Sequence, residues 1–152
     1  MTGATILEPS RDGERINALV NHPAIRPHVG GDVARPLDLS AAVADCDNFF
    51  LLGEHGGFAC CWSAPSVFEV HTFILPEGRG PWAAQAAADG IALMAQHGAR
   101  HLWTRVAPDA ENVRSYTLRA GFTPAGVRTL DLGAGPVTYQ LYERRLDQCQ
   151  QQ

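Results

Sequence analysis

The sequence predicts an α/β (α+β) domain with a mixed, mostly antiparallel sheet of about seven strands and helices on both faces. Seven apolar stretches suit strands, helical periodicities are interspersed among them, and Gly- or Pro-containing turns separate them. The predicted order is one strand, helices, three strands, a helix, a strand, a helix and two strands. The 152 residues suit one domain, which we place at residues 1–146, before a polar tail at 147–152.

The N-terminal elements are a short strand, a helix and an irregular connection. Residues 4–7 are apolar and end at a Glu-Pro pair, which predicts the first strand. Ser10 or Asp12 can cap a helix that continues to residue 20. Residues 22–36 hold three prolines and a Gly pair, so we expect an irregular connection there with at most a short helical turn.

A three-strand meander follows a brief helix at residues 39–44. The apolar runs 48–54 and 58–63 flank His-Gly-Gly at 55–57, which predicts a hairpin. Residues 67–75 are rich in β-branched and aromatic side chains and predict a third strand. Consecutive strands joined by short turns are expected to pair antiparallel.

The C-terminal half alternates helices and strands. A Gly/Pro loop at 76–81 precedes a helix at 82–97, in which small and apolar residues recur at helical spacing. Residues 101–106 predict a strand, and Pro-Asp opens a helix over 108–120. A final hairpin joins strands at 123–132 and 136–144; Tyr139 and Tyr142, three apart, are expected on opposite faces, either both in the core or at its rim or with one of them at a binding surface.

Composition excludes several classes of partner. The net charge is −4, all 12 cations are Arg, and no basic cluster appears, which argues against nucleic-acid binding but leaves room for a local anion site. No apolar run is long enough to span a membrane, and the first residues lack a signal-peptide pattern, so we expect a cytoplasmic protein. The four cysteines lack metal-ligand spacing; we expect buried reduced thiols and no metal.

The segment 74–88 has the chemistry of an anion site. A buried strand ends, a Gly/Pro loop follows, and a helix begins at once with small residues. The first-turn N–H groups of a helix lack internal partners and carry partial positive charge. Gly80 lets a phosphate approach the backbone, and Arg79 adds a cation with bidentate geometry. The segment therefore suits a pyrophosphate, although such a loop also occurs as a simple turn.

These residues resemble the acyl-CoA loop of the GNAT superfamily of N-acetyltransferases. Residues 74–84, Ile-Leu-Pro-Glu-Gly-Arg-Gly-Pro-Trp-Ala-Ala, are similar to the pattern V-x-P-x-x-R-G-x-G-x-G/A. Residues 104–106 and 118–122 are similar to the later strand and helix-to-Gly-Phe junction of that superfamily. The stretches 20–23, 49–57 and 69–72 resemble a compact phage and bacterial branch. Segment order and spacing match over most of the chain.

The resemblance implies a GNAT-like fold and acetyl-CoA as co-substrate. It implies cofactor contacts from the strand before the loop and from the loop itself, with one strand amide as oxyanion donor. These cofactor-binding residues are Phe73, Ile74, Leu75, Arg79, Gly80, Pro81, Trp82, Ala83 and Ala84.

Three positions depart from the family pattern. Trp82 replaces the middle Gly of the loop, so its indole either walls the pantetheine or adenine pocket or packs in the core. The family's Asn falls on Ala110, and its general-acid Tyr falls on Thr117, with Tyr116 one residue earlier. One residue rotates a helical side chain by about 100°. We keep Tyr116 as a candidate catalytic residue.

Glu69 and His71 are the candidate catalytic residues upstream of the loop. They lie two apart on a predicted strand and therefore face the same side. A carboxylate and an imidazole together can deprotonate an ammonium directly or through water. The alternative is that both face solvent or form a structural hydrogen bond.

The expected function is direct acetyl transfer from acetyl-CoA to a primary amine of a small molecule or peptide. Two alternatives stay open: a GNAT-type fold that binds acyl-CoA or a protein without turnover, and a structural interaction domain. The closing hairpin could also pair with a second copy, giving a homodimer.

Overall fold

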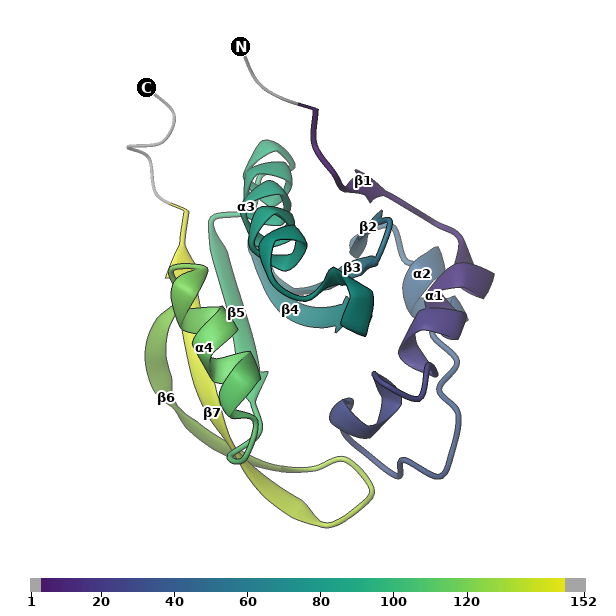
Figure 1. The fold of residues 1–152 in the computed structure, drawn as a ribbon. Coiled ribbons are helices and arrows are strands. Elements are labelled where there is room, and N and C mark those ends of the chain that lie inside the picture. The colour runs from purple at the N-terminus through teal and green to yellow at the C-terminus, as the bar shows by residue number, and fades with distance from the viewer. Residues whose placement is uncertain (1–3, 147–152) are drawn as a thin grey trace.

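The computed structural model describes residues 4–146 and contains one seven-stranded sheet (Figure 1). The strands are β1 Glu8–Pro9, β2 Phe49–Gly53, β3 Gly56–Ala64, β4 Val67–Ile74, β5 His101–Val106, β6 Thr123–Asp131 and β7 Pro136–Arg145. They lie in the order β1-β2-β3-β4-β5-β7-β6, and β4 with β5 is the parallel pair among antiparallel ones. The predicted mixed sheet is confirmed; the predicted tail at 147–152 lies outside the described residues.

Helices cover both faces of the sheet, as predicted (Figure 1). They are α1 Gly13–Val20, α2 Ser40–Ala44, α3 Pro81–Gln96 and α4 Glu111–Arg119, with short 3₁₀ turns η1 Arg26–His28 and η2 Pro76–Gly78. Side chains of α3 and α4 pack on one face with Leu51 and Phe68, while α1 and α2 pack on the other with Phe50 and Phe73. Alternate residues of a strand face opposite sides, so a continuous apolar run such as β2 serves both cores.

The first strand is shorter and later than predicted. Residues 4–7 do not join the ladder; β1 is Glu8–Pro9, paired with β2 at the edge of the sheet, where a proline is tolerated. Asp89 of α3 explains the difference, because its carboxylate accepts the Ile6 N–H at 2.8 Å and the Thr5 hydroxyl at 3.2 Å. Side-chain hydrogen bonds therefore replace strand pairing in this segment.

Two other boundaries differ from the prediction by more than one residue. The first hairpin turns at residues 54–55, and Gly56 and Gly57 already belong to β3. α4 begins at Glu111 rather than at residue 108, because the Ala110 N–H first closes a turn on the Ala107 carbonyl at 3.1 Å. Within residues 4–146, none of the helices has the length and apolarity needed to cross a bilayer.

Candidate functional site

β4 and β5 separate part-way along their length. Their parallel ladder holds three residue pairs and ends at Glu69 with Trp103, although β4 continues to Ile74. Just past that point the Thr104 hydroxyl donates to the Val70 carbonyl at 2.8 Å. Beyond it, no further β4–β5 pair occurs in the described part of the chain. The sheet therefore presents unpaired strand edges at its middle.

Only part of the β4 backbone is directed at β5 there. The Val70 carbonyl points toward β5, and alternate strand residues direct their backbone groups to the same side. Ile74 therefore also faces β5, whereas Phe73 faces β3, where it pairs with Gly57. The Leu75 N–H donates to the His55 carbonyl at 2.9 Å. Among the strand residues assigned from the resemblance, only Ile74 directs its amide at the opening.

The loop after β4 leads into the N-terminus of α3. Gly80, the residue before the helix, has φ +95°, a conformation that favours glycine. Pro81 is the first helical residue and has no N–H, and the Ala84 N–H donates to the Gly80 carbonyl at 3.1 Å. Of the predicted contact residues, Trp82 and Ala83 therefore offer the first-turn amides, while Pro81 and Ala84 offer none.

Arg79 is the cation of this loop. Its side chain is exposed and, within residues 4–146, forms no hydrogen bond or ion pair. A guanidinium at a helix N-terminus adds to the partial positive charge of the first-turn amides. The loop can therefore bind a phosphate group.

Trp82 packs against the first hairpin. Its indole meets the His55 ring edge-on, with centroids 5.1 Å apart and an interplanar angle of 77°. A Cβ atom at Gly53 or Gly78 would come within 2.9 or 3.0 Å of the indole. The indole thus fills the space between the hairpin and the loop. Of the two roles expected for Trp82, the structure supports packing.

Tyr116 binds α4 to the first turn of α3. Its hydroxyl donates to the Ala83 carbonyl at 2.6 Å, and burial raises the pKa of Tyr116 well above its usual range. The neighbouring Thr117 is buried, and its hydroxyl donates to the Val113 carbonyl at 2.7 Å. Both hydroxyl protons are engaged within the fold, and the catalytic role of Tyr116 stays a prediction.

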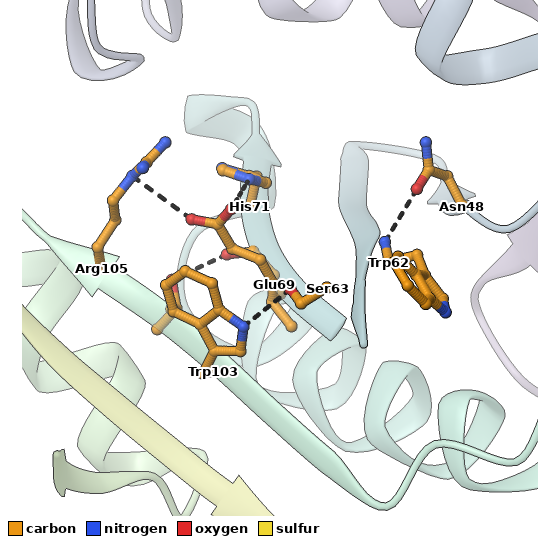
Figure 2. Close-up of polar contacts among 9 residues, drawn as sticks. Asn48, Trp62, Ser63, Glu69, His71, Trp103 and Arg105 are labelled. Atoms are coloured by element: carbon orange, nitrogen blue, oxygen red, sulfur yellow. Dashed lines mark hydrogen bonds and ion pairs between the residues drawn. The ribbon is translucent and has the colours of Figure 1, made fainter. Parts of the chain in front are cut away.

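Glu69 and His71 lie together on the α1/α2 face of the sheet, as their spacing predicted (Figure 2). The His71 Nε2 atom lies 3.3 Å from Glu69 Oε1, and the Nε atom of Arg105 lies 3.4 Å from Glu69 Oε2. Their side chains are 16% exposed for Glu69, 24% for Arg105 and 30% for His71. A carboxylate is thus held between two cationic groups at the place where β4 and β5 separate.

The electrostatics separate the roles of the two residues. Burial alone would raise the pKa of Glu69, but the hydrogen bond and charge of His71, with Arg105 and Arg128, outweigh it and lower that pKa. Burial alone would lower the pKa of His71, but contacts with Cys61 and Glu69 raise it to about 9. These contacts favour the protonated imidazole at neutral pH, and a catalytic role for His71 as a base stays a prediction. Glu69 is ionised and can accept a proton.

One oxygen of Glu69 has unused hydrogen-bonding capacity. Its Oε2 atom is buried and accepts no hydrogen bond from the described residues, because the Arg105 contact is an ion pair without hydrogen-bond geometry. Buried polar atoms are usually satisfied, so an exception indicates a place for water or a ligand donor. A water molecule or a substrate ammonium fits this requirement.

The sequence prediction missed Arg105. Its segment, residues 104–106, was recognised as a strand, but the side chain was given no role. Alternation along β5 does place Arg105 on the face of Trp103. Its contact with Glu69 depends on the parallel β4–β5 register, which a sequence does not determine.

The prediction that the cysteines are buried thiols is confirmed only in part. Cys60 is buried, and burial raises its pKa well above the usual range. Cys61 is half-buried beside His71, whereas Cys46 is exposed, contrary to the prediction, because it lies in the turn after α2. Cys149 lies outside the described residues.

Neither a protein-family model nor a curated protein matches the sequence. Solved structures do match the fold. A protein provisionally named phosphinothricin N-acetyltransferase has a TM-score of 0.72 at 15% identity, covering 93% of this chain and 98% of its own. A provisionally named acetyltransferase from Salmonella typhimurium, solved with its cofactor acetyl-CoA, has a TM-score of 0.71 at 13% identity, covering 96% of each chain.

A third match carries a family name. The GNAT-family acetyltransferase from Bacillus anthracis has a TM-score of 0.66 at 11% identity and covers 94% of this chain and 96% of its own. Identities this low establish the fold, which agrees with the separated strands and the loop before α3. The chain therefore has the fold of the GNAT acetyltransferases.

Proposed function

We propose that this protein transfers the acetyl group of acetyl-CoA to a primary amine of a small molecule or peptide. The observation that carries the proposal is the separation of β4 from β5 directly before the loop and N-terminus of α3. An unpaired strand edge suits the amides of a pantetheine arm, and a helix N-terminus with Arg79 suits a pyrophosphate. The Salmonella typhimurium protein with the same fold was solved with acetyl-CoA.

Ile74 would act on the thioester carbonyl, and Glu69 would act on the proton of the attacking amine. The Ile74 N–H is directed at the opening and would donate to the thioester carbonyl oxygen, where negative charge develops during attack. The amine nitrogen attacks the carbonyl carbon, the carbon–sulfur bond breaks, and the leaving thiolate takes a proton from water. No covalent enzyme intermediate is required.

Glu69 would receive the proton that the amine loses. Its buried Oε2 atom is free to accept a hydrogen bond from a bridging water, and the carboxylate is ionised at neutral pH. The lowered pKa makes Glu69 a weak base, so it suits a water relay better than abstraction of a proton from a strongly basic ammonium. His71 and Arg105 fix the carboxylate in position.

A Glu69→Gln variant tests this assignment. We expect acetylation across a panel of primary amines to fall by roughly 10²–10⁴-fold in kcat, the usual contribution of a general base. Stabilisation by acetyl-CoA should stay unchanged, because Glu69 lies on the opposite face of the sheet from α3. Glu111→Gln, an exposed site at the start of α4, is the matched control and should retain full activity.

Two outcomes would count against the proposal. Equal activity of wild type and Glu69→Gln would remove Glu69 from catalysis. Saturable acetyl-CoA binding with no acetylation of any amine would instead favour an acyl-CoA-binding module, which the engaged hydroxyls of Tyr116 and Thr117 make a specific alternative.

A further inference from the structure

A row of charged side chains crosses the α1/α2 face beyond Glu69. Arg105 of β5 lies over the ring of Tyr139 of β7, with its guanidinium carbon 5.6 Å from the ring centroid. Arg128 of β6 is the cross-strand partner of Tyr139, so it lies on the same face. The row therefore extends over four neighbouring strands, from His71 and Glu69 on β4 to Arg128 on β6.

The row has more positive than negative charge. His71, Arg105 and Arg128 are cationic at neutral pH, and Glu69 is the carboxylate among them. A second carboxylate on this face, Glu143 of β7, is engaged elsewhere: it lies 3.5 Å from His101 and 3.6 Å from Arg145. In the connection between α1 and α2, Asp32 lies 3.6 Å from Arg35.

The two arginines retain unused donors. Arg105 contacts Glu69 through Nε, its terminal nitrogens extend away from Glu69 (Figure 2), and they donate to no described residue. Arg128 is exposed and, within residues 4–146, its interaction is the long-range attraction to Glu69. A guanidinium fork fits the two oxygens of a carboxylate or of a phosphorus oxoanion. The cation–π contact of Arg105 with the Tyr139 ring holds this guanidinium over β7.

The connection between α1 and α2 packs against the row at Tyr139 of β7. A Cβ atom at Gly30 would come within 3.2 Å of the Tyr139 hydroxyl, so the connection packs directly on this ring. The buried side chain of Arg26 holds the connection in shape by donating to the carbonyls of Val29, Asp32 and Arg35 at 2.7, 2.6 and 3.0 Å. The connection therefore limits the length of an acceptor that lies along the row.

We propose that the acceptor is a small amine that also carries an oxoanion, and that Arg105 and Arg128 bind this oxoanion while the amine lies toward Glu69. The inference rests on the proposed acetyl transfer and names the substrate class of that site. An amino acid or an aminophosphonate has the required pair of groups. A simple alkylamine or a polyamine does not, because it would meet the cationic row without a compensating charge.

The test compares amino acids and aminophosphonates with the matching carboxamides and amino alcohols as acceptors. The carboxamide amine loses its proton more readily, so intrinsic reactivity favours the compound that lacks the oxoanion. We expect wild-type kcat/KM to favour the oxoanion-bearing member of each pair by roughly tenfold or more, as a charged hydrogen bond supplies. Arg128→Gln should remove most of this preference through KM with little change in kcat.

Arg105→Lys and Arg119→Gln complete the set of variants. Arg105→Lys keeps the charge beside Glu69 but loses the fork, so the preference should fall while the pH profile of kcat stays in place. Arg119→Gln changes an exposed arginine of α4 on the other face and should leave the preference unchanged. A preference that survives in Arg128→Gln and Arg105→Lys, or is absent in wild type, overturns the proposal.

A binding experiment separates this inference from the proposed function. Calorimetric titration of the CoA-saturated protein with each acceptor pair needs no turnover. Tighter binding of the oxoanion-bearing member, lost in Arg128→Gln, supports the site even if acetylation is never observed. Equal binding of both members contradicts it even if acetylation occurs.

Discussion

Glu69 shows how far single residues could be assigned from the sequence. The spacing of Glu69 and His71 along one strand was sufficient to place both on one face, and the structure confirms that placement. Arg105 could not be predicted beside them, because it comes from another strand through a parallel register that only the folded sheet defines. The same holds for the pKa of His71, because the neighbours that raise it, Cys61 and Glu69, come from two strands.

The pH dependence of stability tests the state of His71. Its pKa in the folded protein is about 9 against an ordinary 6.5, so the folded state favours the protonated imidazole. The resulting stabilisation is complete below pH 6.5 and is lost as the pH rises through 9. Relative to His71→Gln, wild type should be about 1–3 kcal/mol more stable at low pH, with partial exposure reducing the upper value.

Chemical denaturation of both proteins at a series of pH values measures this difference. We expect the stability difference to shrink as the pH rises from 6.5 to 9. In this range the unfolded chain has already lost the imidazole proton, whereas folded His71 still holds it, so each rise in pH favours unfolding of the wild type. A constant difference between wild type and His71→Gln from pH 6.5 to 9 would show that the ion pair with Glu69 does not form.

Among the elements, the loop and α3 were the most predictable. A Gly/Pro loop followed by small residues at helical spacing specified both, and the helix starts within one residue of its predicted position. The direction of the Trp82 side chain was not predictable, because it depends on the first hairpin reaching the loop through His55 and Gly53. The predicted position of the first strand was wrong for a similar reason. The carboxylate of Asp89, distant in sequence, accepts the Ile6 N–H that strand pairing would have used.

Gly80→Ala tests whether this loop binds the cofactor through its backbone conformation. Gly80 has φ +95° and ψ −134°, and an added Cβ meets no atom within 4 Å, so the penalty is purely conformational. We expect a loss of about 1–3 kcal/mol in unfolding free energy and weaker acetyl-CoA binding, measured by thermal denaturation and calorimetry.

Gly98→Ala is the matched control for this loop. Gly98 follows α3 at its other end, has φ +92°, and also has free space around a Cβ. It should lose comparable stability without losing acetyl-CoA affinity. If both variants bind acetyl-CoA as wild type does, the backbone of the loop takes no part in binding.

At the scale of the whole molecule, the sequence predicted the order of elements but not the order of strands. Turn residues and periodicity are local and marked most boundaries, and the closing hairpin formed as expected. The position of β7 between β5 and β6, and the separation of β4 from β5, arise from long-range pairing. The opening that defines the candidate site is thus a property of the assembled sheet.

Thermal denaturation of the wild-type protein over a titration with acetyl-CoA tests the central claim most directly. A ligand that binds only the folded state stabilises it by about 2.7 kcal/mol at a hundredfold excess over its Kd. For a chain of this size that corresponds to a rise of roughly 5–10 °C in Tm. We predict a saturable rise of this order at micromolar to millimolar acetyl-CoA. An unchanged Tm at millimolar acetyl-CoA would contradict the cofactor site and the acetyl transfer that depends on it.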